Sequence, residues 1–260
     1  MSINSDISVS GMLPFLSNRS LADNITVYDT VGSTNDRAKE MIKNGAAHGT
    51  VLIARTQTSG KGRHGREFFS PPGSGIYMSL ILNYEKTAFL PVTMATVFSA
   101  VAVCQAIESL SDAEPRIKWV NDIFMHGRKV GGILTESAMG KQLVVGIGIN
   151  MSYPAKGFPD ELEDIAGAVF SVCETAISQN HLAAEIINRM LTDKYMPDET
   201  ALISDYRKRL MMLGRTVTVI DGGSSYKAEA IDIDHKGHLI VRDSSGRFIT
   251  LSHGEISTKI

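Results

Sequence analysis

The sequence predicts an α+β protein, built from a larger part that mixes strands and helices and a small β-barrel at its C-terminal end. Short apolar runs such as 76–82 and 143–150 are typical of buried strands. Residues from about 161 to 212 instead show helix-like groupings of apolar side chains. After Leu213 the pattern changes to four or five short strands, separated by turns that contain glycine and aspartate.

The first elements follow from local patterns. Residues 1–24 are rich in serine and asparagine and have little periodicity, so we expect a loose lead-in. Residues 25–28 predict a strand, and a helix follows from residue 32 through residue 44. The signals that bound this helix are a cap at Ser33 or Thr34 and a stop at Gly45.

Further strands are expected at 50–55, 76–82, 116–120, 130–136 and 143–150, with residues 126–129 forming the hairpin turn between 116–120 and 130–136. One segment without charge, 87–107, is long enough to be considered as a membrane span. Because it contains many small and polar residues, we interpret it as a helix that begins near Pro91 and is buried in the fold.

The C-terminal domain is expected at residues 213–260. Its strands are predicted at 216–220, 228–233, 239–242 and 248–251, with tight turns between them. The expected organisation is therefore a lead-in at 1–24, a main domain at 25–212 and the small domain at 213–260.

Composition narrows the class of protein. The 260 residues carry a net charge of −2, so basic character is local and general binding of polyanions is not expected. The two cysteines, Cys104 and Cys173, are isolated in apolar, helix-like text, which favours packed thiols in a reducing cytoplasm. The N-terminus lacks the basic and apolar regions of a signal peptide.

The most informative segment is 59–66, which reads S-G-K-G-R-H-G-R. Its glycines let the backbone approach a ligand closely and permit positive φ, so successive N–H groups can surround an anion. Its basic side chains add charge-assisted donors for phosphate. We therefore expect a phosphate-bearing ligand here, although a solvated surface loop could have the same composition.

This spacing also satisfies the dinucleotide fingerprint G-x-G-x-x-G, but its context excludes that interpretation. A strand precedes the loop as required, whereas residues 67–75 hold two prolines and two glycines and cannot begin a helix. The P-loop pattern fails as well, because neither Lys61 nor Lys141 is followed by Ser or Thr.

Four segments, taken in order, resemble the biotin protein ligases. They read G-S-T-N at 32–35, the glycine-rich segment beginning at Gln57, K-W-V-N-D at 118–122 with R-K-V-G-G at 128–132, and G-I-G-I-N at 146–150. The resemblance covers about residues 25–260. Three residues depart from the family pattern: Lys61 replaces arginine, Val120 replaces proline and Phe68 replaces a frequent tryptophan.

The resemblance implies a mixed-sheet catalytic domain of the biotin/lipoate ligase type and a C-terminal SH3-like β-barrel. It implies that biotin is activated by ATP, with Mg²⁺, to biotinyl-AMP and is transferred to a lysine in the biotin acceptor domain of a carboxylase. About thirty residues precede Ser33, too few for the DNA-binding module of some members, so we expect no nucleic-acid partner. We expect no membrane partner, and a monomer or a homodimer.

By resemblance, the biotin-binding residues are Ser33, Thr34, Asn35, Gln57, Lys61, Gly62, Arg63, Lys129 and Gly132. The nucleotide-binding residues are Arg63, Arg66, Phe68, Lys118, Asn121, Asp122 and Asn150. The catalytic cations are Lys129, Arg63 and Lys118, and the Mg²⁺ contact is Asp122. These residue types suit the chemistry, because a neutral ureido head needs fixed donors and acceptors and two reacting anions need cations.

Simpler interpretations stay open for several of these residues. Ser33 and Thr34 suit a plain helix cap, Gln57 a polar strand end, Phe68 a core position and Asn121-Asp122 a simple turn. The cations would be ordinary surface ion pairs, and Trp119 a core residue. At the level of function, the alternatives are a biotin- or adenylate-sensing regulator and a lipoate or octanoyl protein ligase. We also expect the loop 58–72 to be mobile when empty and to order over the adenylate.

Overall fold

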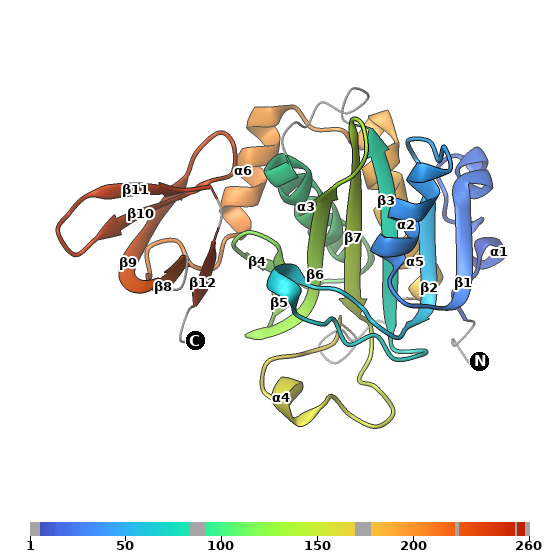
Figure 1. Cartoon of the computed structure of the whole chain (residues 1–260), viewed down its shortest axis with the longest axis horizontal. Helices are drawn as coiled ribbons and strands as arrows, with labels where there is room; N and C mark the ends of the chain where they lie inside the picture. The colour runs from blue at the N-terminus through green and yellow to red at the C-terminus, as the bar shows by residue number, and fades with distance from the viewer. Residues whose placement is uncertain (1–5, 84–91, 170–177, 222–223, 253, 258–260) are drawn as a thin grey trace.

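The computed structural model describes residues 6–83, 92–169, 178–221, 224–252 and 254–257 (Figure 1). Its larger part is built on a seven-stranded sheet with the strand order β1-β2-β3-β7-β6-β5-β4. The β1–β2 pair is parallel and the other neighbours are antiparallel, so the sheet is mixed, as predicted. Its strands are β1 (Ile25–Val31), β2 (Val51–Gln57), β3 (Gly75–Asn83), β4 (Arg116–Lys118), β5 (Asp122–Met125), β6 (Arg128–Ser137) and β7 (Gln142–Asn150).

Helices cover both faces of this sheet (Figure 1). On one face α2 (Thr34–Lys43) packs against β2, β3 and β7; on the other, α3 (Val92–Leu110) and α5 (Gln179–Leu191) form the larger core. Alternation along β2 shows the division, because Leu52 packs with α2 while Val51 and Ile53 belong to the larger core. This double burial explains why β2 reads as a continuous apolar run.

The sequence missed one strand in this sheet. Residues 126–129 were expected to turn directly between 116–120 and 130–136, but β5 lies between β4 and β6, and β4 ends already at Lys118. The turn is narrower than expected and centres on His126 and Gly127, which have φ of 48° and 76°. This strand has only four residues and begins at the second residue of the pair Asn121-Asp122. Its short apolar pattern is therefore weaker than the turn signals around it.

Residues 7–24 pack against the main domain, so the loose lead-in expected at 1–24 is wrong for this part, and residues 1–5 lie outside the described residues. They contain α1 (Val9–Met12) and a 3-10 helix (Arg19–Asn24), and Met12 is fully buried. Two asparagines of α5 tie this segment down: Asn180 Oδ1 accepts from the Ser8 N–H at 2.9 Å, and Asn188 Oδ1 accepts from the Ser17 N–H at 2.8 Å. A few apolar residues are enough to anchor a segment whose composition looks unstructured.

The uncharged segment forms the core helix α3, and most of its side chains are buried. By length and composition α3 could cross a membrane, but 72% of its most apolar window is buried inside the fold, as the sequence analysis expected. The expected start at Pro91 lies outside the described residues. Cys104 on α3 is fully buried, and burial raises the pKa of its thiol to about 12, so it is a packed thiol. Cys173 lies outside the described residues.

The segment 161–212, which was predicted to be mainly helical, contains α5, α6 (Glu199–Arg209) and the end of α4 (Asp160–Glu163) within the described residues. The C-terminal domain then forms a separate five-stranded antiparallel sheet in the order β11-β10-β9-β8-β12. Its strands are β8 (Thr216–Asp221), β9 (Ser224–Ile233), β10 (Leu239–Asp243), β11 (Phe248–Leu251) and β12 (Glu255–Ser257). The α+β class with a small all-β domain is confirmed.

Two buried hydrogen bonds connect the segment after β4 to its surroundings. The Trp119 indole Nε1–H donates to the Gly237 carbonyl of the small domain at 2.9 Å. The Tyr206 hydroxyl of α6 donates to the Val120 carbonyl at 2.9 Å. The small domain and α6 therefore hold the turn at 119–121 that precedes Asp122, and Trp119 is the core residue that the simpler interpretation expected.

Candidate active site

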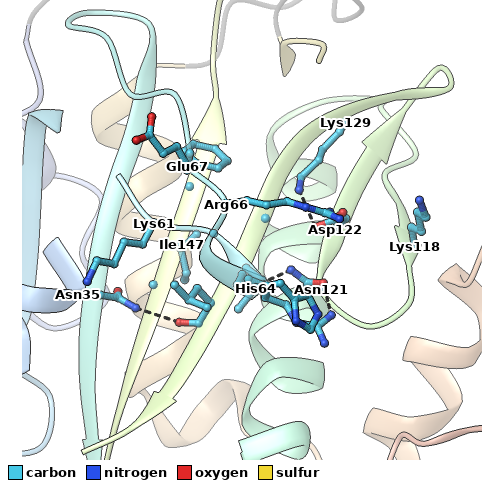
Figure 2. A pocket seen from close by; sticks show the side chains of 18 of the residues that line it. Asn35, Lys61, His64, Arg66, Glu67, Lys118, Asn121, Asp122, Lys129 and Ile147 are labelled. Atoms are coloured by element: carbon cyan, nitrogen blue, oxygen red, sulfur yellow. Dashed lines mark hydrogen bonds and ion pairs between the residues drawn. The ribbon is translucent and has the colours of Figure 1, made fainter. Parts of the chain in front are cut away.

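A cavity of about 490 Å³ lies between the open part of the sheet and the glycine-rich loop (Figure 2). Its wall comes from the strands β2 to β7, from α4 and the start of α2, and from β12 of the small domain. The volume falls within the range of small-molecule sites, about 300–1,000 Å³. Of the residues that the sequence analysis assigned to the site, only Asn150 is absent from this lining.

One end of the cavity is a cluster of neutral polar side chains. Gln57 Oε1 accepts from the Thr34 backbone N–H at 2.8 Å and from the Thr34 hydroxyl at 3.1 Å. The Ser79 hydroxyl lies 2.6 Å from Asn35 Oδ1 and 2.8 Å from Thr34 Oγ1. Thr34, Asn35 and Ser79 are buried. Such a set of fixed donors and acceptors suits a neutral polar head group.

The simpler interpretations of Ser33, Thr34 and Gln57 explain little of this cluster. Ser33 occupies the N-cap position of α2, but its side chain makes no capping hydrogen bond. Thr34 directs its hydroxyl to Gln57. The Gln57 amide in turn donates to the Ser70 hydroxyl at 2.9 Å, so it is anchored on both sides and is more than a polar strand end.

The glycine-rich loop folds back on itself over the cavity. The Gly62 N–H donates to the Arg66 carbonyl at 2.8 Å, and the Phe68 N–H donates to the Gly60 carbonyl at 2.9 Å. Gly60 is required by close approach, because a Cβ there would lie 2.3 Å from the Phe68 carbonyl oxygen. Gly65 is required by its φ of 73°, and His64 before it shares the left-handed region at 56°.

Lys61 lies at the edge of the cavity, on the same side as Asn35 (Figure 2). Its ammonium bonds Asp36 Oδ1 at 2.7 Å, and this hydrogen bond raises the pKa of Lys61. The two side chains are 45% and 44% exposed, so the pair is a solvated one that ties the loop to α2. A lysine makes such a point contact as well as the arginine expected at this position.

Arg63 and Arg66 leave the loop in the direction of the small domain. Arg63 donates to Asn121 Oδ1 and to the Gly254 carbonyl, both at 3.0 Å, and burial lowers the pKa of its guanidinium. Arg66 forms a bidentate pair with Glu255 at 2.8 and 2.6 Å. That hydrogen bond raises the pKa of Arg66 and lowers the pKa of Glu255.

A second cationic group comes from β4, β5 and β6. Lys129 Nζ lies 2.7 Å from Asp122 Oδ1, across the cavity from Asn35 (Figure 2). Lys118 lines the cavity farther along and places its ammonium 6.0 Å from the centre of the Phe124 ring. Gly132 keeps the space beside this pair open, because a Cβ there would already lie 3.4 Å from Lys129 Cε. Two predicted cations, Lys118 and Lys129, therefore line this part of the cavity.

Asn121 belongs to a turn, as its composition suggested, but its side chain has a further role. Its Oδ1 accepts from Arg63 and its Nδ2 donates to the Ile133 carbonyl at 3.0 Å. Asp122 is the first residue of β5 rather than a turn residue. The pair thus connects the glycine-rich loop to β6.

Phe68 lies over β7 at a place where that strand has no side chain. A Cβ at Gly148 would lie 2.6 Å from the Phe68 ring, and one at Gly146 would lie 2.3 Å from Asn35 Oδ1. The predicted nucleotide contact of Asn150 has no support in this geometry. Asn150 is buried outside the cavity lining, and its amide donates to the Gly167 carbonyl at 3.0 Å.

Two kinds of lining residue were not predicted from the sequence. Glu255 and Ile256 come from the small domain. The only sequence signal for them was that the resemblance to the family extends to this C-terminal segment. The apolar wall consists of residues that local sequence marks simply as core or surface: Met78, Phe124, Ile133, Leu134, Ile147, Leu162 and Ile165. No periodicity distinguishes a side chain that faces a ligand from one that faces a neighbour.

The acidic residues do not form a metal cage of their own. Among the described residues, no group of three His, Cys, Asp or Glu side chains is placed to hold an ion. Asp122, the predicted Mg²⁺ contact, is paired with Lys129. A Mg²⁺ ion commonly binds through one or two carboxylates together with substrate phosphates. The donor set therefore fits an ion that enters with a nucleotide and does not fit a resident metal.

Comparison with protein families gives two matches. Residues 27–151 match the biotin/lipoate A/B protein ligase family, and residues 212–258 match the biotin protein ligase C terminal domain. The biotin–[acetyl-CoA-carboxylase] ligase of Paracoccus denitrificans is 36% identical, over 83% of this chain and 92% of the relative. The bifunctional ligase/repressor BirA of Bacillus spizizenii is 31% identical, over 87% of this chain and 71% of the relative.

Solved structures of biotin protein ligases are also similar to this chain. The biotin protein ligase from Aquifex aeolicus in complex with biotin and ATP superposes with a TM-score of 0.78 at 25% identity. The match covers 90% of this chain and 97% of that one. The biotin protein ligase from Leishmania major in complex with biotinyl-5-AMP superposes with a TM-score of 0.63 at 23% identity, over 88% and 99% of the two chains, which shows a shared fold.

Proposed function

This chain belongs to the biotin protein ligase family and is an ATP-dependent ligase that activates biotin, and we propose how its side chains divide that work. The observation that carries the proposal is the polarity of the cavity. Neutral hydrogen-bonding groups gather around Asn35 and Thr34, and cations gather around Lys129 and Arg63. Biotin has the same division, with a neutral ureido ring at one end and a carboxylate at the other.

We propose that the ureido ring binds at the neutral end. Thr34, Asn35 and Gln57 would contact it there, with Ser33 and Lys61 beside them and Gly62 of the loop above. The apolar wall described above would pack against the carbon skeleton of biotin, and Gly132 would leave room for the chain that leads to the carboxylate.

In the first step a carboxylate oxygen of biotin attacks the α-phosphorus of ATP, and the bond to the bridging oxygen of pyrophosphate breaks. Two anions must approach each other, so cations that are already in place supply much of the catalysis. We assign this role to Lys129, Arg63 and Lys118. Asp122 holds Lys129 Nζ at 2.7 Å, and thereby orients an ammonium that would otherwise have several rotamers.

We assign Arg66, Phe68, Asn121 and Asp122 to the nucleotide. Phe68 offers an aromatic face beside Gly148, and Arg66 offers a guanidinium once it leaves Glu255. Mg²⁺ would enter with the ATP phosphates and take Asp122 as its protein ligand. When bound, the ion would neutralise phosphate charge; the protein's own contribution is the placement of the cations.

In the second step the amine of an acceptor lysine attacks the carbonyl carbon of biotinyl-AMP, AMP leaves, and the amine loses a proton. We propose the biotin acceptor domain of a carboxylase as this partner, because two relatives are biotin–[acetyl-CoA-carboxylase] ligases. We also propose a soluble, cytoplasmic protein, consistent with a long apolar helix that is buried in the fold. A monomer or a homodimer, and the absence of a nucleic-acid partner, stay predictions.

The test is incubation with biotin, ATP and Mg²⁺ plus a biotin acceptor domain, read by intact mass. We expect one biotin adduct on the acceptor lysine. Tight biotin binding by calorimetry without an adduct would favour the sensing regulator instead. Neither signal, across several acceptor domains, would favour lipoate or octanoate as the ligand.

A further inference from the structure

Glu136, on β6 near the edge of the cavity, contacts the neutral end of the site from outside. Its Oε2 accepts from Asn35 Nδ2 at 2.8 Å, and its Oε1 pairs with Lys39 Nζ at 2.5 Å. The Glu136 and Lys39 side chains are 28% and 31% exposed, whereas Asn35 is buried. A charged pair at the surface is thus bonded directly to a buried amide of the site.

This contact fixes which way the Asn35 amide faces. Both partners of Asn35 Nδ2, the Glu136 carboxylate and the Leu134 carbonyl at 3.2 Å, can only accept hydrogen bonds. The amide nitrogen must therefore lie on that side, and Oδ1 must face Ser79. A hydrogen bond to a carboxylate is stronger than one to a neutral carbonyl, so Glu136 supplies the larger share of this preference.

The orientation of the Asn35 amide also affects the hydrogen bonds at the neutral end of the cavity, because few hydroxyl protons are available there. Ser79 has one hydroxyl proton and two oxygens within reach, Asn35 Oδ1 at 2.6 Å and Thr34 Oγ1 at 2.8 Å. Because the 2.6 Å contact needs that proton, Ser79 donates to Asn35 Oδ1, and this amide oxygen keeps a second lone pair that can accept from a ligand. Thr34 gives its own proton to Gln57 Oε1, 3.1 Å away.

We propose that Glu136 is a positioning residue for the ureido ring: it holds the Asn35 amide so that acceptor oxygens face the N–H groups of the ligand. The inference rests on the proposed function, because a cyclic urea carries two N–H donors. With the amide reversed, its NH₂ group would confront those N–H groups and a bond would be lost. Glu136 would thus select ligand chemistry without touching the ligand.

The first experiment is Glu136→Gln, studied by calorimetry with biotin alone. We expect the Kd for biotin to rise about tenfold. The KM for ATP, and the rate of adenylate formation at saturating biotin, should stay within about threefold, because the reacting carboxylate lies at the other end of the cavity. Biotin methylated on a ureido nitrogen is the probe of polarity, and the discrimination between it and biotin should shrink in the variant.

A matched control and a compensating change separate positioning from general damage. Glu40→Gln removes another α2-side carboxylate, paired with Arg37 and 59% exposed, and should leave the Kd unchanged. Asn35→Asp should weaken biotin binding strongly, because it sets two carboxylates against each other. Adding Glu136→Gln to Asn35→Asp should recover part of the affinity, because a glutamine amide can donate to the new carboxylate.

An unchanged Kd and unchanged discrimination in a folded Glu136→Gln variant would overturn the inference, as would a double variant no better than Asn35→Asp. Thermal melting reports folding, and the single glutamine variant is informative even if Asn35→Asp does not fold. If the unaltered protein neither binds biotin nor forms adenylate, then the proposed function fails first, which is a separate result.

Discussion

Arg66 donates two hydrogen bonds to the carboxylate of Glu255, at 2.8 and 2.6 Å, and so joins the glycine-rich loop to the last strand of the small domain. Arg63 repeats the connection with its bond to the Gly254 carbonyl. The two arginines assigned to phosphate therefore both contact the C-terminal domain. With the nucleotide role that we propose for Arg66, the nucleotide would have to compete with Glu255 for this side chain.

The pH dependence of stability tests this contact through Glu255→Gln. Because Arg66 lowers the pKa of Glu255 below 4.5, the contact stabilises the native protein above about pH 4.5 and is lost as the pH falls through the lowered value. The native protein should exceed the variant by no more than about 1 kcal/mol at pH 7, since the pair is partly solvated. The difference should vanish in acid, as measured by urea unfolding; a difference that grew in acid would contradict the assignment.

Lys129→Ala should reduce adenylate formation by a factor on the order of 100 or more, because it removes the cation between the two reacting anions. Single-turnover formation of biotinyl-AMP, separated by chromatography, measures the effect. Lys43→Ala, at the exposed end of α2, is the control for loss of one positive charge. Near-normal turnover in the Lys129 variant would remove this residue from the mechanism.

Arg63→Ala should release adenylate faster, because Arg63 is the half-buried contact between the loop, Asn121 and the small domain. We expect weaker binding of biotin as well. Dissociation of labelled biotinyl-AMP after a chase gives the rate directly, with Arg63→Lys as the variant that retains the charge but not the two-armed contact. An unchanged dissociation rate would show that the loop does not clamp the intermediate.

Gly148→Ala should raise the KM for ATP several-fold, since its methyl group would lie 2.6 Å from the Phe68 ring and displace it. Gly32→Ala is the steric control, because a Cβ there meets no atom within 4 Å. Initial rates of pyrophosphate release at varied ATP measure the effect. If the KM for ATP is unaltered in Gly148→Ala, Phe68 is a core residue and has no part in nucleotide binding.

The loop 58–72 should become resistant to trypsin when biotin and ATP are added together. The cleavable bonds follow Lys61, Arg63 and Arg66, whose side chains would be engaged by ligand and phosphate in the loaded enzyme. Time courses of digestion, read by mass spectrometry, give the cleavage rate in each state. Equal rates with and without ligands would mean that the loop does not order over the adenylate.

The sequence predicted the main strands, the core helix and the small domain because each has a strong local pattern. The long apolar runs of β3 and β7 and the spacing of turns after Leu213 are examples. The errors concern elements that are too short to have a clear sequence pattern and segments whose structure depends on contacts distant in the chain. β5 has only four residues, and the segment 7–24 that contains α1 is held by Asn180 and Asn188, more than 150 positions away along the chain.

The residues that the family pattern names gather around one cavity, and their roles stay predictions. Fourteen of the fifteen assigned residues line this cavity, whereas Asn150 lies outside its lining and donates to the Gly167 carbonyl. Glu136 shows the opposite case. Glu136 lies near the end of an ordinary strand, and the local sequence does not indicate that its carboxylate contacts Asn35 on α2.

Gly146 and Gly148 have a consequence for the evolution of ligand range. At these positions β7 has nothing left to trim, so single substitutions there can shrink the cavity but never widen it. The neighbouring Ile147 and its partner Met78 offer no room either, because the pleat turns both side chains to the opposite face, where they belong to the main core. A broader substrate range therefore cannot come from shortening side chains on β7, which favours a narrow specialist.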